Sequence, residues 1–541
     1  MSTRLPLLPT GYSDFTTIRE DNMLYVDKTP FVYELANLTY GSYFFLSRPR
    51  RFGKSLLVST LAALFSGKKE LFNGLFIENV WNWSKKYKVI SLDFSAMQPA
   101  KNEAEFLALF GRMVSRRCAS AGIELVDLST PNGLPSDSIS KFIDTLSVQP
   151  TNSIVLLIDE YDAPLTPHLD NPKLFSTFQN LLHRIFIDLK SVGASCIHFF
   201  FMTGITKIGQ AGIFSGFNNI NDISLESNFG EILGYTQTEI RSSFSGYLQR
   251  AAAVSNMSED EVLQDLTSHY DGYCFDELVS THVFCPFSVM RYFSNPKKGF
   301  DNYWFKSAGK PTALVSYLKK NRLWSGICAE RENAVIPKSD LLASHNLEDL
   351  DPDSMLMQMG YLSIKSIDGQ RVILDHPNVE VRQSFSLLYT DLFLGDNKIY
   401  EFKSEEIKDP LSKGSADEVM AFLNRLMTSA DYNDVHQISN EAICRFCIQI
   451  CLSANGIHPR TEVHNAFGRS DLELDVGQYR WVFEFKFAAQ RKNAPALLKE
   501  AEAQIVSRHY GESNLSKRKL IRIGLVYSKE DRCFTHWSVV P

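Results

Sequence analysis

A glycine, a lysine and a serine stand in succession at Gly53, Lys54 and Ser55, near the end of the segment SRPRRFGKSLL. A loop of this kind can bind phosphate, because its backbone N–H groups, the lysine charge and a hydroxyl for Mg²⁺ converge on one anion. The pattern normally opens with a glycine, and here Arg48 occupies that place. The segment therefore predicts nucleotide binding, and Arg48 leaves hydrolysis as the open question.

The segments on either side of this loop predict that it joins a strand to a helix. Residues 41–47, GSYFFLS, form a short aromatic and apolar run of the kind found in buried strands. Residues 54–67 carry leucines at helical spacing. The first turn of such a helix has unpaired N–H groups that favour an anion, and they add to the charge of Lys54.

Two carboxylates follow a second apolar run further along the chain. Residues 154–158 are all apolar, which is typical of a buried parallel strand, and Asp159 and Glu160 come directly after them. Open α/β sheets bind their ligands at the carboxyl ends of such strands. We expect Asp159 to hold Mg²⁺ through water and Glu160 to polarise the attacking water.

Two more strands are expected in the same sheet, over residues 88–95 and 198–207. If the strand order is that of a P-loop ATPase, Thr203 and Thr206 lie near the γ-phosphate. The residues expected at the nucleotide are Arg48, Arg51, Phe52, Gly53, Lys54, Ser55, Asp159 and Thr203, with Ser55 and Asp159 also at the metal.

The segment YVDKTPFVYELANLTYGSYFFLSRPRRFGKSLL, with LIDEYDAPL and FMTGITKIGQ downstream, resembles the AAA-ATPase-like family of bacterial proteins over roughly residues 5 to 225. Arginine is that family's own residue at the first loop position, so the resemblance implies that Arg48 is compatible with a working loop. It also implies ATP as the nucleotide, with ATP hydrolysis as an inferred activity.

A second set of acids and a lysine lies near the C-terminus, in GRSDLELDV and YRWVFEFKF. Metal-dependent phosphodiester cleavage needs carboxylates that gather divalent ions and a cation that stabilises the developing charge. Strand alternation places Glu484 and Lys486 on one face of the second segment, with Phe483 and Phe485 on the other. If the two segments pair as a hairpin, Asp471 comes within reach of a metal shared with Glu484.

Two flanking helices are expected to complete this set. Residues 439–452 form an amphipathic pattern that carries Glu441, and residues 500–511 carry Gln504 and Tyr510. The whole set resembles the PD-(D/E)xK nuclease superfamily over roughly residues 400 to 535. The resemblance implies catalytic Asp471, Glu484 and Lys486, metal ligands Glu441, Asp471 and Glu484, Mg²⁺ or Mn²⁺ as the ion, and Gln504 and Tyr510 as supporting helix residues.

Other residues of the same types have plainer interpretations. Residues 401–403 repeat Glu-Phe-Lys but precede a charge run, which favours a solvated edge strand. Glu462 is interpreted as a solvated strand-end residue rather than a further ligand. Cys444, Cys447 and Cys451 share one helical face with apolar residues, so we expect structural burial rather than a metal or cluster site.

Length and composition set the outer limits of these expectations. The chain has 541 residues, of which 44% are hydrophobic and 22% charged, with a net charge of -6. This composition is typical of a globular protein of two to four domains and argues against a surface of positive potential throughout. Nine cysteines, several in apolar runs, and the lack of a membrane-length apolar run favour a cytoplasmic protein.

We therefore predict an α/β fold: a P-loop ATPase with a parallel sheet and helical lid, followed by a C-terminal α/β restriction-endonuclease-like nuclease domain. In the lid, Ser258 and Glu261 are spaced as a helix-capping box. The expected divisions are 1–230 for the ATPase, 231–335 for the lid, 336–400 for a connector with hairpin strands, and 401–541 for the nuclease.

The expected function is an ATP-binding, ATP-hydrolysing protein whose nucleotide state gates a Mg²⁺-dependent nuclease. Nucleic acid, DNA more than RNA, is the expected partner, a membrane is not, and a homo-oligomer is compatible with the pattern. By analogy with other ATPase–nuclease fusions, the role lies in defence or DNA repair. The alternative is a nucleotide-dependent switch that grips nucleic acid or protein without cleavage. Arg241, Arg250 and Arg291 are open candidates for an arginine finger.

Overall fold

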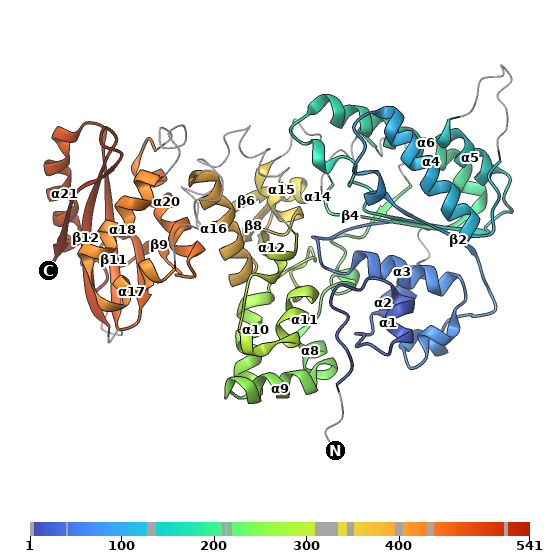
Figure 1. Ribbon diagram of the computed structural model, residues 1–541, viewed down its shortest axis with the longest axis horizontal. Coiled ribbons are helices and arrows are strands. Elements are labelled where there is room, and N and C mark those ends of the chain that lie inside the picture. Colours follow the sequence, from blue (N-terminus) through green and yellow to red (C-terminus); the bar gives the residue numbers. More distant parts are fainter. Residues whose placement is uncertain are drawn as a thin grey trace. The chain divides into compact units, whose positions relative to one another are not determined.

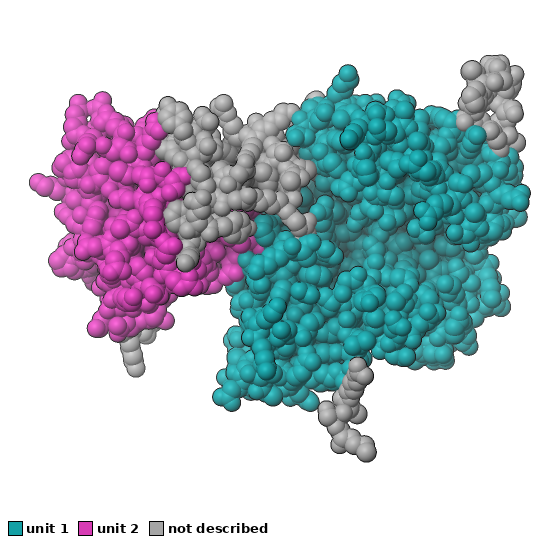
Figure 2. Space-filling view, viewed as in Figure 1, with its two compact units in different colours: residues 1–317, 335–380 teal, residues 318–334, 381–541 magenta. Residues whose placement is uncertain are grey.

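The structure is a computed structural model that describes residues 5–38, 42–126, 137–207, 212–213, 219–308, 334–342, 351–394, 404–429, 438–512 and 518–541. The chain packs into two compact units, which are coloured separately in Figure 2. The first comprises residues 1–317 and 335–380, and the second comprises residues 318–334 and 381–541. Residues 335–380, expected in a connector, are thus packed with the first unit. The four-part division of the chain stays a prediction.

The first unit is built on a parallel sheet of five strands in the order β2-β3-β4-β1-β5. Its strands are β1 (Tyr43–Ser47), β2 (Lys88–Asp93), β3 (Ile154–Asp159), β4 (Ile197–Gly204) and the short β5 (Asn221–Asp222). Every residue of β3 is buried, as expected for a parallel strand covered on both faces. The expected strands are confirmed, and β1 and β3 both flank β4.

Helices cover both faces of this sheet. Figure 1 shows α1 (Phe15–Glu20), α2 (Thr29–Ala36) and α3 (Lys54–Phe65) on one side, with α4 (Glu103–Ser120), α5 (Ser138–Ser147) and α6 (Pro172–Cys196) on the other. The amphipathic α5 buries Ile139, Phe142 and Leu146, spaced three to four residues apart. This arrangement leaves the loop between β1 and α3 at the carboxyl edge of the sheet.

The expected helical region follows the sheet and consists of α8 (Gln237–Ser243), α9 (Ser245–Ser255), α10 (Glu259–Tyr270), α11 (Pro286–Ser294) and α12 (Tyr303–Ala308). Its core joins aromatic residues of several helices, among them Phe244 and Phe293, whose rings stack 5.4 Å apart. The capping box of Ser258 and Glu261 is present at the start of α10.

A small sheet completes the first unit. It has the order β6-β8-β7, from strands β6 (Ala334–Pro337), β7 (Ser363–Asp368) and β8 (Arg371–Asp375). The expected hairpin is the antiparallel pair β7–β8. The nearby helices are α14 (Lys338–Leu342), α15 (Pro352–Gln358) and the beginning of α16 (Val379–Leu394), through which the chain passes into the second unit.

The second unit contains a mixed sheet of five strands in the order β13-β12-β11-β10-β9. Its strands are β9 (Arg460–His464), β10 (Arg469–Val476), β11 (Tyr479–Ala488), β12 (Lys519–Ser528) and β13 (Cys533–Val540), and its helices are α17 (Glu405–Lys413), α18 (Ala416–Ser429), α20 (Glu441–Ala454) and α21 (Ala494–Ser507). Strands β11 and β12 are parallel, and the other pairs are antiparallel.

Both faces of β11 are covered, as Figure 1 shows for the helices on either side of this sheet. Val482 packs with Ile505 and Tyr510 from the α21 side. On the opposite face, the indole of Trp481 donates to the carbonyl of Leu411 in α17. The α/β fold class expected for both halves of the chain is confirmed.

Two expectations about special segments are answered within the described residues. Eight cysteines in this part of the chain are free thiols, and Cys444, Cys447 and Cys451 are buried as expected. None of the helices among the same residues is both long and apolar enough to cross a membrane. The Glu-Phe-Lys repeat at residues 401–403 lies outside the described residues.

Candidate nucleotide and metal sites

The loop between β1 and α3 depends on backbone conformations that favour glycine. Gly53, the residue before α3, has a φ of +95°, in the left-handed region where a side chain strains the backbone. Arg51 also has a positive φ, of 69°. The chain therefore makes its sharp turn at positions 51–53 rather than at the arginine that replaces the expected first glycine.

Arg48 is buried, and its guanidinium group serves the fold. It is 1% exposed, and it donates to the carbonyls of Ser47 at 2.9 Å, Ser224 at 2.6 Å and Phe229 at 3.0 Å. The group also lies 4.3 Å from the ring centre of Phe275. Burial lowers the pKa of Arg48 to about 9. Its side chain is absent from the lining of the nearby cavity, so contact with a nucleotide through that side chain stays a prediction.

Lys54 lies over the loop from the first turn of α3. Its Nζ donates to the carbonyl oxygens of Arg48 at 2.8 Å and Pro49 at 2.9 Å, and the residue is 5% exposed. Burial lowers its pKa, and the negative charges of Glu160 and Asp159 oppose that shift. The ammonium group is thus held between the loop backbone and the acidic end of β3.

Asp159 and Thr203 join the ends of two neighbouring strands. The Thr203 hydroxyl donates to Oδ1 of Asp159 at 2.5 Å, and both side chains are buried. The contact exists because β4 lies between β1 and β3, which is the strand order that the expectation for Thr203 required. Glu160 follows with a φ of 52°. Burial raises the pKa of Glu160, and the nearby charge of Lys54 offsets part of that rise.

Asp162 is a buried structural acid that our sequence analysis missed. Its carboxylate accepts the backbone N–H of Ile205 at 3.1 Å and that of Thr206 at 2.8 Å, and also the Thr206 hydroxyl at 2.9 Å. It therefore fixes the turn after β4. The signal in the sequence was its place three residues beyond Asp159, at the same edge of the sheet.

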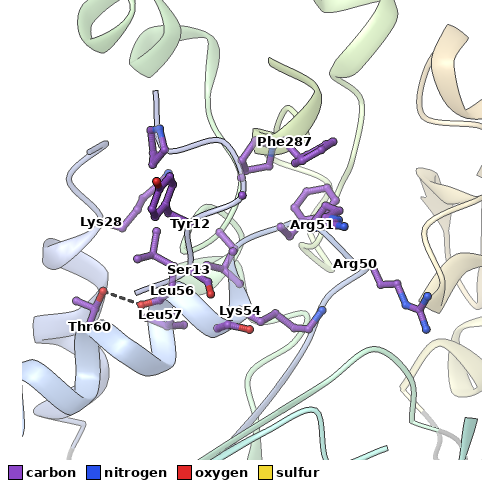
Figure 3. Close-up of a pocket in the computed structure, with 18 of the residues that line it drawn as sticks. Tyr12, Ser13, Lys28, Arg50, Arg51, Lys54, Leu56, Leu57, Thr60 and Phe287 are labelled. Carbon is purple, nitrogen blue, oxygen red and sulfur yellow. Dashed lines mark hydrogen bonds between the residues drawn. The ribbon is translucent and has the colours of Figure 1, made fainter. Parts of the chain in front are cut away.

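Lys54, Glu160 and Asp162 border a cavity of about 500 Å³, shown in Figure 3, whereas Asp159 and Thr203 are not part of its lining. Its polar side includes the loop, Lys54 and Glu160, and its apolar side includes Val26 and Met290. Pro9, Gly11, Tyr12 and Ser13 also line it, with Tyr12 and Ser13 visible near the start of α3. A volume of this size suits a nucleotide-sized ligand. The lining residues expected from the sequence are Arg51, Phe52, Gly53, Lys54, Ser55 and Glu160.

Two of the loop side chains face the helical region. Arg51 donates to the carbonyl of Ser307 at 2.9 Å and lies over the ring of Phe287, and Phe52 packs against Tyr273. The three arginine-finger candidates stand elsewhere: Arg241 pairs with Asp260, Arg250 donates to the carbonyl of Phe293, and Arg291 lies over the ring of Tyr303. None of these three belongs to the cavity lining.

In the second unit, strands β10 and β11 bring the expected acids together. Leu472 pairs with Phe483, so the antiparallel register continued by one step sets Asp471 opposite Glu484. Oδ2 of Asp471 accepts the backbone N–H of Phe485 at 2.7 Å. The predicted hairpin is therefore confirmed, and it presents the two carboxylates on one face.

Glu484 and Lys486 form a buried ion pair on that face. Nζ of Lys486 lies 3.0 Å from Oε1 of Glu484 and 3.8 Å from Oε2 of Glu441, the first residue of α20. Burial and the nearby Asp471 raise the pKa of Glu484 to about 8, and burial raises that of Glu441 to about 6. Burial opposes the charge of Lys486, but the surrounding carboxylates outweigh it and raise its pKa.

Arg445 is a further charge in this cluster that the sequence did not reveal. It lies on α20 four residues after Glu441, and its Nη1 is 3.3 Å from Oδ1 of Asp471 and also contacts Glu462. Glu462 is further paired with Arg469. Interpreting Glu462 as a solvated residue was wrong, because its side chain is 15% exposed and is paired with two arginines.

Asp471 and Glu484 fit Mg²⁺, which also takes water and substrate phosphate as ligands, better than a metal whose ligands are all protein side chains. Oε2 of Glu484 is buried and has no hydrogen-bond partner among the described residues. The same part of the chain shows no group of three or more acidic, histidine or cysteine side chains placed to hold a metal. Mg²⁺ is commonly bound by one or two carboxylates with water and substrate phosphate, so Asp471 and Glu484 fit it.

Gln504 and Tyr510 lie together at the end of α21. Nε2 of Gln504 donates to the Tyr510 hydroxyl at 3.2 Å, and Nη1 of Arg508 donates to the same oxygen at 3.2 Å. Tyr510 is fully buried against Val482, two residues before Glu484 on β11. The pair thus supports the strand that carries the acid and the lysine.

Comparison with known proteins gives one family match in each half of the chain. Residues 9–214 match the family model described as predicted AAA-ATPase, and residues 439–537 match the model of the PD-(D/E)XK nuclease superfamily. The chain is 26% identical over 543 residues to the "Uncharacterized protein in vnfD 5'region" of Azotobacter chroococcum mcd 1, with 97% of each chain covered. Both resemblances expected from the sequence are confirmed as matches to family models, one near each end of the chain.

Proposed function

We propose that this protein binds and hydrolyses ATP in its first unit and cleaves DNA or RNA in its second, with the nucleotide state gating cleavage. The observation that carries the proposal is the buried juxtaposition of Asp471, Glu484 and Lys486 on one hairpin, with Oε2 of Glu484 left without a protein partner among the described residues. The two matching family models support an ATPase–nuclease fusion at the level of protein families.

In the first unit, the chain would bind the triphosphate through the loop backbone and Lys54. A phosphate at the start of α3 would accept hydrogen bonds from the unpaired N–H groups of the first helical turn. It would also accept from the Lys54 ammonium group, which in this structure donates to loop carbonyls. Ser55 and Asp159 would hold Mg²⁺, which neutralises phosphate charge when bound. Glu160, at the cavity wall, would accept a proton from the attacking water.

In the second unit, Asp471 and Glu484 would hold the divalent ion. When bound, such an ion lowers the pKa of a water molecule and neutralises charge on the scissile phosphate. Lys486 keeps Glu484 oriented through its 3.0 Å contact, and its ammonium group would stabilise negative charge that develops on the phosphate oxygens. Glu441, with its raised pKa, would hold or release a proton beside Lys486.

A chain of contacts supports the gating part of the proposal. The indole N–H of Trp304 donates to the carbonyl of Arg50 in the loop at 3.2 Å. The backbone N–H of Trp304 donates to the buried carboxyl group of Glu380 at 2.7 Å. Glu380 is the second residue of α16, the helix in which the chain passes into the second unit. These contacts connect the loop to the start of α16 through one residue, Trp304.

The test of the nuclease part is cleavage of labelled single- and double-stranded DNA and RNA with Mg²⁺ or Mn²⁺. Lys486→Met is expected to lower the rate about 100-fold or more, because it removes a charge that the transition state uses. Lys492→Met, an exposed lysine after the same strand, is the matched control and is expected to cleave like wild type. Equal rates in wild type and Lys486→Met would contradict the proposal. Absence of cleavage with ATP still bound would favour the binding switch.

A further inference from the structure

The turn between β9 and β10 presents an aromatic ring to solvent. Phe467 is 65% exposed, whereas Phe483 and Phe485 on β11 are almost fully buried. A single exposed apolar residue is ordinary on a protein surface. Phe467 differs from an ordinary exposed residue because its turn is held by specific hydrogen bonds and has charged groups beside it.

Asn465 fixes the turn and ties it to α21. Its Oδ1 accepts the backbone N–H groups of Phe467 and Gly468, each at 2.8 Å. Its Nδ2 donates to the carbonyls of Arg508 at 2.8 Å and His509 at 3.2 Å, just after the end of α21. The His509 ring lies 5.0 Å from that of Phe467. The exposed ring therefore lies on a turn that is held by hydrogen bonds within itself and to the residues that follow α21.

Arg508 adds an exposed cation beside this turn. Its side chain packs over Gly468, where an added Cβ would come within 2.5 Å of Arg508 Cδ and would push the arginine side chain aside. Its Nη1 donates to the Tyr510 hydroxyl. That bond is the main reason why the pKa of Arg508 is raised, and the charge of Glu484 contributes too. Arg508 thus stands between the turn and the acids.

We propose that this turn binds an unpaired nucleotide of the substrate strand, with Phe467 stacking on the base and Arg508 contacting the backbone phosphate. The inference rests on the proposed nuclease function and names its substrate contact. An aromatic face beside a cation is the usual means of holding a single strand.

The short sequence distance between the turn and the acids suits this role. Phe467 precedes Asp471 by four residues, so the two residues lie at most about 13 Å apart. Neighbouring bases along one strand of a duplex rise by about 3.4 Å, so the stacked base would lie a few nucleotides from the cleaved bond. In a duplex, both faces of each internal base are covered by neighbours, so a free ring can stack only on an end or an unpaired base. The turn therefore favours single strands, overhangs or frayed ends.

The test measures binding rather than cleavage. Fluorescence anisotropy of a labelled single-stranded DNA oligonucleotide and of its blunt duplex is compared, without divalent ion, for full-length wild type, Phe467→Ala and Phe467→Trp. Val539→Ala is the matched control, because Val539 is 51% exposed on β13 of the same sheet. Melting curves show that each variant is folded. An oligonucleotide with 2-aminopurine reports stacking directly through its quenching.

Phe467→Ala is expected to weaken single-strand binding about 5- to 100-fold and to abolish the quenching, since base–aromatic stacks are of that strength. Phe467→Trp and Val539→Ala are expected to bind within about twofold of wild type. Equal binding by Phe467→Ala would overturn the proposal even if the protein cleaves with Mg²⁺, and wild type that binds no single strand would overturn it too. Loss of binding in Phe467→Ala without any cleavage would support the turn and refute the nuclease.

Discussion

Replacing Glu380 by glutamine tests the buried contact of Trp304 that leads from the β1–α3 loop to α16. The carboxyl group is fully buried, and its two oxygens accept the backbone N–H of Trp304 and the hydroxyl of Ser288, each at 2.7 Å. Burial raises its pKa from 4.5 to about 8. The group is therefore mostly protonated at neutral pH, and glutamine resembles that neutral form.

The sign and size of the effect follow from linkage. Between pH 4.5 and 8 the folded protein keeps a proton on Glu380 that the unfolded chain has lost, so stability falls as pH rises through this window. A shift of one pKa unit corresponds to 1.36 kcal/mol of unfolding free energy. Near pH 8 the folded protein also begins to lose the Glu380 proton, so the unfolding free energy falls less steeply with pH there. The free energy of unfolding is expected to be about 2 kcal/mol lower at pH 8 than at pH 6 because of this one group.

Urea denaturation at pH 6, 7 and 8 measures this contribution as the difference between wild type and Glu380→Gln. Other titrating groups cancel in that difference, so the variant gains about 2 kcal/mol relative to wild type over the range. Glu124→Gln, at an exposed glutamate of the same unit, is the control and is expected to give no such gain. A difference that stays constant with pH would refute the buried, protonated state of Glu380.

Three further predictions concern the two sites. Lys54→Ala is expected to weaken ATP binding at least tenfold in a fluorescent-nucleotide titration at a temperature where a melting curve shows the variant to be folded, and unchanged affinity would contradict the role of the loop. The affinity for Mn²⁺, followed by its electron paramagnetic resonance signal, is expected to rise about tenfold or more from pH 6 to 8, because Glu484, with a pKa of about 8, must lose its proton. Glu484→Gln is expected to bind the ion weakly with little pH dependence, and an identical pH profile in both proteins would contradict this assignment. Asp162→Asn is expected to lower stability by about 2 to 4 kcal/mol, measured by thermal denaturation, because the amide group cannot accept all the N–H and O–H donors at that site.

Much of the first site could be predicted because local patterns determine it. The apolar run of β3 and the leucines of α3 give periods that fit one element each, and the functional residues stand at their ends. The position of Thr203 beside Asp159 was conditional on strand order, which no local pattern determines. The structure supplies that order.

The burial of Arg48 could not be predicted from the sequence. A run of arginines is usually solvated, and its burial here depends on the carbonyls of Ser224 and Phe229, some 180 residues away in the chain. Such partners become visible only in the folded protein. The same holds for Asp162, whose donors lie beyond the end of β4.

In the second unit, strand alternation predicted the face of Glu484 but not its depth. Burial arises because that face is also covered, with Val482 packed against α21. Arg445 stood in a helix that was recognised only for its acid and its cysteines. Its contact with Asp471 requires α20 to lie against β10, which periodicity alone does not show.

The most direct test of the central claim is the rate of Mg²⁺-dependent DNA cleavage by the full chain with and without ATP, in wild type and Lys54→Ala. The account predicts that ATP changes the wild-type rate at least fivefold and leaves the rate of the variant unchanged, consistent with a coupling of about 1 to 3 kcal/mol. A wild-type rate that is the same with and without bound ATP would contradict nucleotide gating.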